Sequence, residues 1–469
     1  MSKQQYDLVI IGAGAGGLIA AGFAVQLGAK VALVEKDRIG GDCTWTGCVP
    51  SKALLKAAKV AHLVRTASQY GIMSQTPVTD MAKVQEYLDA AIRQIYKATT
   101  PEELRQKGMD VYLGPARFVD RVSILTGDKA IRSKHFLITT GARPFIPQIN
   151  GLDSVPYLTY EHIFDNKRLP RSMIAVGGGP IGAEIAQAYQ RLGCQVTIVA
   201  ERLLPKEDPD VRQLLQQVFE REGIRFVWGR AAAVHQDGDT VVVSAGKEEV
   251  RGEMLLVASG RRPNFDGLNL EKAGVHYTEK GIKIDDRLRT TAKHIYAAGD
   301  VVGGYQFSHF AGWQAFQAVR NALLPGSSSG LTDLVPRITF TDPEVAQVGP
   351  TEEQARFQFG QGIAVCRWNL SRVDRAVCEN DRNGFIKLIA KTNGTILAST
   401  IVAERAGETI NEAVVAIKHK LKINDIAGTI HAYPTYSTGL QLLVTEMTVE
   451  KLLSGTSGRI VRAVSALAR

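Results

Sequence analysis

The chain has 469 residues, of which 45% are hydrophobic and 45 are glycine, and its formal net charge is +9. This length is too great for a single ordinary hydrophobic core, so we expect about two to four domains. The sequence contains no run of about 18 apolar residues, so we expect no membrane-spanning helix. The basic residues are scattered, which favours attraction for anionic cofactors over nucleic-acid binding. Five cysteines are too few for a secreted disulfide scaffold. Because MSKQQY leads straight into an apolar segment, we expect a cytoplasmic protein without a signal peptide.

The first motif has the order strand, glycine turn, helix, strand and acid. Its parts are Tyr6–Ile11, GAGAGG with Gly12, Gly14 and Gly17, the helical stretch Leu18–Leu27, the apolar run Lys30–Val34, and Glu35. Gly12 permits the tight turn, Gly14 lets a pyrophosphate approach the backbone, and Gly17 lets the helix pack on the strand. The helix N-terminus attracts the phosphate charge. Glu35 stands where a carboxylate can accept hydrogen bonds from ribose hydroxyls, so the motif predicts a dinucleotide site.

The same device recurs later in the chain. Its parts are the strand Met173–Val176, GGGPIG with Gly177, Gly179 and Gly182, a helix that ends at Leu192, and the strand Gln195–Val199. Two complete copies predict two Rossmann-like dinucleotide-binding domains. We expect one to hold a flavin adenine dinucleotide (FAD) and the other a nicotinamide nucleotide.

Two cysteines, Cys43 and Cys48, lie in GGDCTWTGCVPSK just after the first motif. Their offset in a straight helix is a rise of about 7.5 Å, too long for a relaxed disulfide, whose Cα atoms lie about 4.4–6.8 Å apart. The segment must therefore bend if a disulfide forms, and Gly47 supplies the backbone freedom. The alternative is a pair of unrelated buried cysteines in a reducing cytosol.

Three further apolar strands end in turns that carry the candidate cofactor-binding residues Gly141, Gly260 and Asp300. The turns in 135–144 and 254–263 are where we expect the chain to leave each nucleotide domain. Asp300, in 294–302, follows the carboxyl end of a strand, where ligands bind in open α/β sheets; the alternative is an ordinary strand-end turn. From about residue 335 the segments RITFT, FIKLIA and TILAST predict an antiparallel sheet, with helices near 351–358, 407–420 and 435–453. The predicted organisation is a flavin domain in 1–150 and 273–335, a nicotinamide domain in 151–272, and a C-terminal α+β domain in 336–469.

The chain resembles the class I, FAD-dependent pyridine nucleotide–disulfide oxidoreductases over essentially its whole length. The resemblance rests on motifs in a fixed order: GAGAGG, GGDCTWTGCVPSK, TTGARP, GGGPIGAE, ASGRRPN, AAGD, TDPEVAQVG and HAYPT. This family includes dihydrolipoamide dehydrogenase, glutathione reductase and mercuric reductase. The resemblance implies an α/β protein with two Rossmann-like domains, a C-terminal dimerisation domain and a homodimer.

The resemblance also implies roles for individual residues. Gly12, Gly14, Gly17 and Glu35 would hold the adenosine half of FAD, and Asp300 its ribityl chain. Cys43 would be the thiol that attacks the substrate. Cys48 would face the flavin as a thiolate, favoured by the N-terminus of a helix that we expect to begin near Pro50. Lys52 would lie near the flavin and pair with Glu184; the alternative is an unrelated surface lysine and helix glutamate. The HAYPT segment would come from the other subunit.

Some positions depart from the family pattern. Dihydrolipoamide dehydrogenase and glutathione reductase carry a His-Pro step and a glutamate five residues past the histidine, whereas here Tyr433 precedes Pro434 and Thr438 takes the place of the glutamate. Tyrosine has an ordinary pKa near 10 and is a poor base at neutral pH, so Tyr433 favours the mercuric reductase-like branch. His431 is either a substitute base or a structural histidine.

Other departures argue the opposite way. No cysteine follows Cys378, whereas mercuric reductases end in a cysteine pair that hands over the metal. Between Cys43 and Cys48 the chain carries Thr44, Trp45 and Thr46 in place of the family's usual Val-Asn-Val. Glutathione reductase is disfavoured because Gly22 and Phe23 replace its arginine pair.

The nucleotide preference depends on the end of the strand Gln195–Val199. The acid that would bind a ribose 2′-hydroxyl is replaced by Ala200, followed by Glu201 and Arg202. Arg202 favours the 2′-phosphate of NADPH, and Glu201 leaves NADH possible.

Three functions remain open from the sequence. The first is reduction of Hg(II) or another thiol-bound electrophile, with Cys43 and Cys48 as transient metal ligands. The second is reduction of a small or protein disulfide. The third is a redox-sensing flavoprotein that binds a partner or a membrane surface through its basic, mildly amphipathic segment Leu452–Arg469.

Overall fold

The computed structural model describes residues 5–453 and 455–468, with side chains throughout these ranges except at 455–457. The start of MSKQQY and two residues of the basic C-terminal segment, 454 and 469, lie outside the described residues. The chain divides into two compact units. The first unit comprises Met1–Arg202 and Gly223–Thr332, and the second comprises Leu203–Glu222 and Asp333–Arg469. Each is described by itself.

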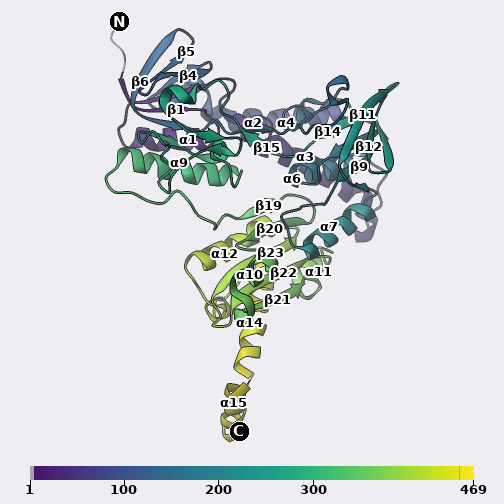
Figure 1. The fold of residues 1–469 in the computed structure, drawn as a ribbon. Coiled ribbons are helices and arrows are strands. Elements are labelled where there is room, and N and C mark those ends of the chain that lie inside the picture. The colour runs from purple at the N-terminus through teal and green to yellow at the C-terminus, as the bar shows by residue number, and fades with distance from the viewer. Residues whose placement is uncertain (1–4, 454, 469) are drawn as a thin grey trace. The chain divides into compact units, whose positions relative to one another are not determined.

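The first unit contains a seven-stranded sheet in the order β3-β2-β1-β6-β5-β4, with β18 paired to β6 (Figure 1). The strands are β1 Gln5–Ile11, β2 Val31–Glu35, β3 Met109–Leu113, β4 Ala116–Asp120, β5 Ser123–Thr126, β6 Lys129–Ile138 and β18 Ile295–Ala297. β1, β2, β3, β6 and β18 pair in parallel, and β4 and β5 add an antiparallel edge. Parallel strands covered on both faces account for the continuous apolar runs in the sequence.

Two helices cover one face of this sheet. α1 (Ala15–Gln26) and α9 (Ser308–Leu323) pack against each other (Figure 1). Their alanines share a buried cluster with Leu8, Ile10 and Leu33 of the sheet. Small residues on both helices let α1 lie close to β1, which fixes the glycine turn between them.

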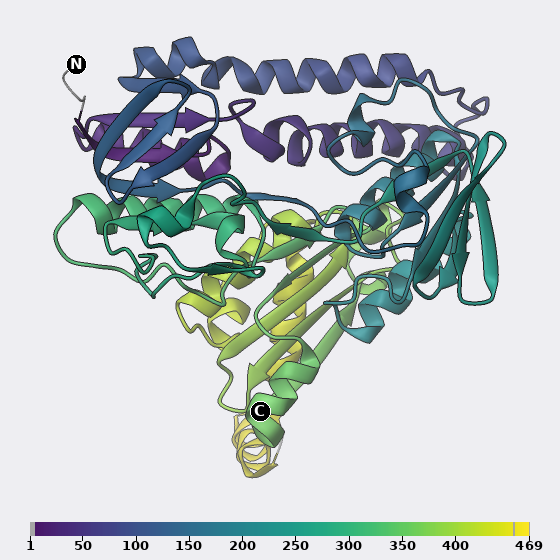
Figure 2. The same cartoon turned by 45° about the horizontal axis from the view of Figure 1, so that its top comes forward.

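The segment after β2 is helical. It comprises α2 Gly41–Trp45, α3 Cys48–Thr66, α4 Met81–Tyr96 and α5 Pro101–Gln106. α3 and α4 run side by side (Figure 2). Asp80 caps α4 by accepting hydrogen bonds from the backbone of Ala82 and Lys83, and Thr100 caps α5, as is usual for these residue types.

The second glycine motif lies in a smaller parallel sheet of the same unit, in the order β10-β9-β8-β14. The strands are β8 Ser172–Val176, β9 Gln195–Ala200, β10 Arg225–Trp228 and β14 Met254–Val257, and the helix after β8 is α6 Pro180–Leu192. An antiparallel sheet packs against it, formed by β11 Ala231–Asp237, β12 Thr240–Ala245 and β13 Glu248–Gly252. A two-stranded ribbon joins β7 (Ala142–Pro144) to β15 (Arg261–Pro263). The unit also contains α8 Leu270–Ala273, β16 Tyr277–Thr278 and β17 Gly281–Ile282.

The second unit is a five-stranded antiparallel sheet with helices around it, in the order β19-β20-β23-β22-β21. The strands are β19 Arg337–Thr339, β20 Glu344–Val348, β21 Ile363–Asn369, β22 Phe385–Lys391 and β23 Ile396–Ala403. The helices are α7 Pro209–Arg221, α10 Glu352–Phe359, α11 Asp374–Cys378, α12 Ala406–Lys418, α13 Ile423–Ala427, α14 Ser437–Leu453 and α15 Gly455–Leu467.

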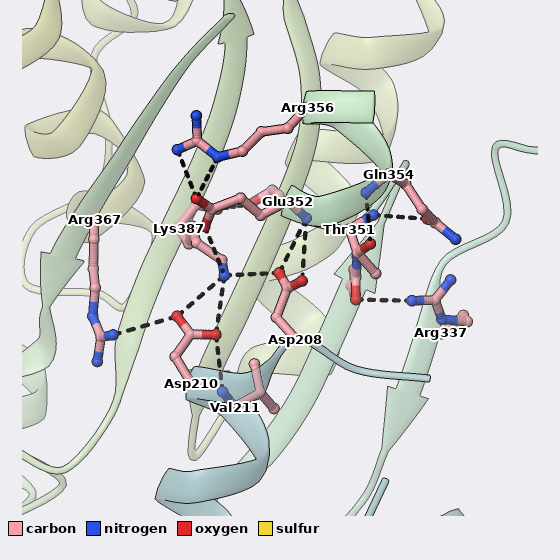
Figure 3. A network of polar contacts seen from close by, with 12 residues as sticks. Asp208, Asp210, Val211, Arg337, Thr351, Glu352, Gln354, Arg356, Arg367 and Lys387 are labelled. Carbon is pink, nitrogen blue, oxygen red and sulfur yellow. Dashed lines mark hydrogen bonds and ion pairs between the residues drawn. The ribbon is translucent and has the colours of Figure 1, made fainter. Parts of the chain in front are cut away.

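A buried lysine joins α7 to this sheet (Figure 3). Lys387 of β22 has 4% of its side chain exposed, and its Nζ lies 2.7 Å from Asp208, 3.0 Å from Asp210 and 3.6 Å from Glu352. Asp208 also accepts a hydrogen bond from the backbone N–H of Glu352. A lysine is rarely buried unless it is paired, so these carboxylates explain why it lies between β22 and the start of α7.

The predicted architecture is confirmed: two Rossmann-like sheets and a C-terminal α+β fold with an antiparallel sheet. The three helices predicted in the C-terminal part agree with α10, α12 and α14 to within two residues at each end. The helix expected to begin near Pro50 begins at Cys48. Within residues 5–453 and 455–468, no helix combines the length and apolar character needed to cross a bilayer.

Candidate active site

The turn between β1 and α1 has the shape that a dinucleotide phosphate needs. Gly12 has a φ of +101°, and a Cβ there would lie 2.5 Å from Thr139 O. A Cβ on Gly17 would lie 1.9 Å from Gly12 O, whereas the nearest atom to one on Gly14 would be 4.0 Å away. Gly14 is the N-cap residue of α1 and has no side chain to cap it, which leaves first-turn N–H groups for a phosphate. The residues therefore fit the adenosine half of FAD.

Glu35 lies at the end of β2 and is buried. Its carboxylate accepts hydrogen bonds from the backbone N–H groups of Ala13, at 2.7 Å, and Asp37, at 2.9 Å. Glu35 thus fixes the glycine turn itself, and carboxylate lone pairs remain for ribose hydroxyls.

The second glycine turn repeats this geometry. Gly177 has a φ of +126°, and a Cβ on Gly182 would lie 2.1 Å from Gly177 O, whereas Gly179 has open space beside it. α6 begins at Pro180, where the missing N–H costs little. Gly141, which follows β6, and Gly260, which follows β14, have positive φ values of +72° and +125° and open space where a Cβ would stand.

The two candidate redox cysteines lie on either side of a break between two helices. Cys43 is in α2 and Cys48 begins α3. A Cβ on Gly47 would lie 2.8 Å from Asp42 O, so the chain folds tightly back at this residue. The predicted bend is therefore present, and Gly47 is needed for its close approach to the backbone of α2.

The redox loop, defined here as residues 40–48, also contacts the first glycine turn. The backbone N–H of Gly40 donates to Ala13 O at 2.8 Å, and a Cβ on Gly41 would lie 2.9 Å from Gly14 Cα. The Cys43 loop therefore packs against the turn that would hold FAD.

Both thiols are free, and their pKa values are shifted in opposite directions. A hydrogen bond from Cys43 is the largest cause that lowers the pKa of Cys48 to about 6, and Ser308 and Lys52 lower it further against the effect of burial. Ser308 Oγ lies 3.3 Å from Cys48 Sγ. The same thiol–thiol hydrogen bond, together with burial, raises the pKa of Cys43 above its ordinary range. Cys48 is thus the thiolate of the pair at neutral pH.

Lys52 of α3 and Glu184 of α6 form an ion pair, with Nζ 3.0 Å from Oε2. The Glu184 side chain is 9% exposed and that of Lys52 is 38% exposed. The positive charge of Lys52 helps to stabilise the Cys48 thiolate. The pair therefore connects the second nucleotide motif to the cysteine region.

Asp300 follows β18 and is buried beside Arg261. Its Oδ2 lies 2.7 Å from Arg261 Nη1, and Arg261 Nη2 lies 2.7 Å from Asp42 Oδ2. Burial raises the pKa of Asp300 above its ordinary value, and the guanidinium of Arg261 only partly offsets this effect. Arg261 thus stands between the predicted ribityl-binding residue and the redox loop.

Trp45, whose role the sequence left unexplained, closes the other end of α2. Its indole N–H donates to Ile39 O at 2.8 Å, the Arg38 guanidinium lies 4.7 Å from the ring centroid, and Tyr96 meets the ring edge-on at 5.0 Å. These contacts immobilise the end of the redox loop opposite Asp42.

At the end of β9, Ala200 is buried and Glu201 is exposed. Glu201 Oε1 lies 3.0 Å from Arg230 Nε. The charge of Glu201 is therefore compensated, and Arg202 adds a further positive charge beside it.

Tyr433 and His431 belong to the second unit. The Tyr433 hydroxyl donates to Asp374 at 2.7 Å, and the side chain is 72% exposed. The hydrogen bond to Asp374 raises the pKa of Tyr433, so it stays protonated at neutral pH. His431 Nε2 lies 2.7 Å from Glu412 Oε1 and Nδ1 lies 2.9 Å from Thr429 O, with 7% of the side chain exposed. Both ring nitrogens are thus occupied within the unit.

Sequence reasoning missed several residues that contact the predicted site residues within each unit. They are Asp42, Tyr160, Arg230, Arg261, Ser308, Asp374 and Glu412. The one sequence signal near Arg261 was its place in ASGRRPN, directly after the candidate residue Gly260. The others depend on contacts between distant segments.

Comparison with known proteins agrees with this geometry. Residues 6–315 match the family of pyridine nucleotide-disulphide oxidoreductases, and residues 335–444 match the dimerisation domain of that family. The chain is 35% identical over 453 residues to a mercuric reductase of Lysinibacillus sphaericus, covering 94% of this chain and 82% of the relative. It is 34% identical over 455 residues to a dihydrolipoyl dehydrogenase of Thermus scotoductus, covering 93% and 96%.

A solved structure is also similar. The HOCl-induced flavoprotein disulfide reductase RclA of Escherichia coli, in its Cu(II) complex, superimposes with a TM-score of 0.86 at 27% identity, covering 94% of this chain and 99% of that one. Two family domains in sequence, two nucleotide turns and an adjacent thiol pair lead to one conclusion. The chain belongs to the pyridine nucleotide-disulphide oxidoreductases, a family of FAD-dependent enzymes that use NAD(P)H.

Proposed function

We propose that this protein is an NADPH-dependent flavoenzyme that reduces a soft metal ion, Hg(II) in the first instance, bound by Cys43 and Cys48. When bound, FAD supplies the chemistry that accepts hydride from the nicotinamide and passes two electrons to the cysteine pair. The observation that carries the proposal is the engagement of His431 by Glu412 and Thr429, because it occupies the histidine that the sequence offers as a substitute for the missing base.

The reaction balances without a proton relay. Hg(II) binds the Cys48 thiolate and Cys43, which gives up its proton; the two sulfurs then give up two electrons, a Cys43–Cys48 disulfide forms, and Hg(0) leaves. The hydride of one NADPH supplies the two electrons and the proton that restore the Cys48 thiolate and the Cys43 thiol, so the sum is NADPH and Hg(II) giving NADP⁺, Hg(0) and one proton. No leaving thiol needs a proton, whereas disulfide reduction requires one for each sulfur released. The lowered pKa of Cys48 supports this role, since metals bind thiolates.

NADPH is favoured as the nucleotide by the charges at the end of β9. The Glu201 carboxylate is paired with Arg230, so its repulsion of a 2′-phosphate is weakened. Arg202 supplies a guanidinium suited to a phosphate. We further propose a homodimer, because residues 335–444 match the dimerisation domain of the family, and Tyr433 of one subunit would complete the site of the other.

The second candidate is a disulfide reductase. It is supported by similarity to dihydrolipoyl dehydrogenase and to RclA, which is described as a flavoprotein disulfide reductase. Tyr433, held protonated by Asp374, would then donate the proton to the leaving thiolate. Turnover of small disulfides that disappears in Tyr433→Phe would favour this candidate over metal reduction.

The test is metal-dependent NADPH oxidation by the purified holoenzyme, with excess small thiol to keep the metal ligated. We expect strong stimulation by Hg(II) that is lost in Cys48→Ser and kept in Cys366→Ser, which alters a half-buried thiol on β21. Cu(II) is assayed in parallel, because RclA was solved as a Cu(II) complex. If no metal stimulates oxidation while NADPH still reduces the cysteine pair, metal reduction is wrong.

A further inference from the structure

Arg261 links the redox loop to the end of β18 through two carboxylates. One guanidinium nitrogen lies 2.7 Å from Asp42 and another lies 2.7 Å from Asp300. Tyr160 completes the cluster: its hydroxyl lies 3.3 Å from Asp42, and its ring lies 5.4 Å from the guanidinium carbon. We call Asp42, Tyr160, Arg261 and Asp300 the Arg261 cluster.

We propose that Asp42 is a positioning residue that acts through Arg261 to hold Cys43 in its reactive place against the flavin site. This inference rests on the proposed function only in treating Cys43 as the reactive thiol. Asp42 directly precedes Cys43 in α2, so its carboxylate is anchored one residue from the sulfur. Arg261 lies on the ribbon of β7 and β15, which belongs to a different part of the sequence.

The redox loop cannot hold this shape through its own backbone. α2 has five residues and is capped by Gly40, whose φ is +106°, without a side-chain hydrogen bond. Helices this short are unstable in isolation. Gly41 at its start and Gly47 after its end add flexibility when the chain is unfolded. The loop is therefore anchored by contacts with other segments: the backbone N–H of Gly40 binds Ala13 O, and the side chains of Asp42 and Trp45 hold the two ends of α2.

The contact between Asp42 and Arg261 belongs to a cluster that is largely shielded from water. The side chains of Arg261 and Asp300 are 19% and 11% exposed, and that of Asp42 is 38% exposed. Burial alone would lower the pKa of Arg261, but Asp300, Tyr160 and Asp42 outweigh it and hold the pKa above its ordinary value. A charged hydrogen bond in such a site is stronger than one in water.

The geometry also indicates which substitution to make. Replacing Arg261 would leave the buried Asp300 carboxylate without its cation, which would destabilise the fold itself. Replacing Asp42 leaves Arg261 paired with Asp300 and in contact with Tyr160. Asp42→Asn removes the charge but keeps an amide oxygen that can accept a hydrogen bond, and Asp42→Ala removes both.

The test uses the NADPH-reduced holoenzyme without any acceptor. In Asp42→Ala we expect hydrogen exchange of residues 40–48 and alkylation of Cys43 by iodoacetamide to rise about tenfold, with a smaller rise in Asp42→Asn, because a charge-assisted anchor is lost. The charge-transfer absorbance of the Cys48 thiolate with the flavin is expected to fall. FAD content is expected to stay at the wild-type level.

The matched control is Asp266→Asn, which removes the carboxylate partner of Arg143 on the same ribbon. It is expected to leave the exchange and alkylation rates of the redox loop at wild-type values. The proposal is overturned if both Asp42 variants behave like wild type, or if Asp266→Asn changes the loop equally. These measurements are made without an acceptor, so they test the role of Asp42 even if the enzyme does not reduce metal ions. Equally, an unchanged redox loop in the Asp42 variants would not argue against metal reduction.

Discussion

Lys52 Nζ lies 3.0 Å from Glu184 Oε2, although 132 positions separate the two residues in the chain. The contact joins α3, which begins at Cys48, to α6, which begins at the second glycine turn. It therefore couples the thiolate region to the nucleotide motif that would bind nicotinamide. The lysine charge also helps to lower the pKa of Cys48.

Because the two side chains form one unit, their substitutions should not be additive. Lys52→Met and Glu184→Gln are each expected to slow NADPH-dependent flavin reduction, and the double variant should be no slower than Lys52→Met. A double-mutant cycle of unfolding by urea is expected to give a coupling of about 0.5–1 kcal/mol, since Lys52 is partly exposed. Fully additive effects on both rate and stability would contradict this coupling.

The Cys48 thiolate should titrate near pH 6 in the reduced holoenzyme. We expect its charge-transfer absorbance to have a midpoint of about 6, and Cys43→Ala to move that midpoint upward toward about 8.5, the ordinary thiol pKa, because the hydrogen bond from Cys43 is lost. Ser308→Ala should produce a smaller upward shift. The measurement is absorbance against pH, with Cys194→Ser as a control that leaves the midpoint unchanged.

The same lowered pKa affects stability in a definite direction. A thiol whose pKa is depressed on folding stabilises the reduced protein above the unfolded pKa of about 8.5, and this contribution is lost as the pH falls through about 6. The reduced wild type should therefore lose stability relative to Cys48→Ser between these pH values. An unchanged difference across this range would contradict the assignment of Cys48 as the thiolate.

Lys387 is expected to be essential for the stability of the second unit. Lys387→Met leaves the buried carboxylate of Asp208 without its cation, whereas the partly exposed Asp210 keeps Arg367 as a partner, so we expect a loss of about 3–5 kcal/mol of unfolding free energy. Chemical denaturation measures it, and Arg225→Met, which removes a solvent-exposed pair with Glu248, is the control with a much smaller effect.

The pH dependence of this network lies in the alkaline range. Burial alone would lower the pKa of Lys387, but hydrogen bonds to Asp208 and Asp210 outweigh it, and the pKa is raised. The stabilisation is thus fully present below about 10.4, the ordinary lysine pKa, and is lost as the pH rises through the raised value. Lys387→Met should lack this alkaline loss.

Tyr433 and His431 should behave differently in turnover. Tyr433→Phe removes the phenol that bonds to Asp374, and we expect Hg(II)-dependent turnover to fall about tenfold, within the range of a single positioned polar group. NADPH reduction of the cysteine pair should be unchanged.

His431→Gln is expected to keep turnover within about twofold while lowering the melting temperature, because it disturbs the contact with Glu412. If His431→Gln lost turnover but kept its normal melting temperature, His431 would be assigned as the base.

Arg202→Ala should lower kcat/KM for NADPH by about tenfold and leave the value for NADH nearly unchanged, since one phosphate–guanidinium contact is removed. Arg230→Ala removes the ion-pair partner of Glu201. It should therefore lower kcat/KM for NADPH relative to that for NADH. Steady-state kinetics with both nucleotides provide the measurement. An equal loss with both nucleotides would assign Arg202 a structural role.

The local parts of the site could be predicted because their signals are short in sequence. The turns at Gly12 and Gly177 follow from glycine spacing between an apolar strand and a helix, and the bend at Gly47 follows from the reach of a disulfide. The predicted C-terminal helices agree because their apolar periodicity and flanking residues are local properties. Boundaries shifted where packing decided them, as at Cys48, which begins α3 two residues before Pro50.

Other features could not be predicted, because their partners are distant in the chain. Nothing near Trp45 in sequence indicates that Tyr96 would meet its ring, and nothing near Asp42 indicates that Arg261 would bind its carboxylate. The sequence left His431 open between base and structural histidine, and its contacts with Glu412 and Thr429 favour the structural role.

The sequence by itself determined the family, the two nucleotide turns and the pair of cysteines, because each depends on residue types at fixed short spacing. The tertiary structure decided which charges meet: Lys52 with Glu184, Arg261 with Asp42 and Asp300, and Lys387 with Asp208 and Asp210. The physical reason is that the strength of an ion pair or a thiolate depends on burial and on partners a few ångströms away. Folding brings these partners together from segments that carry no signal for one another.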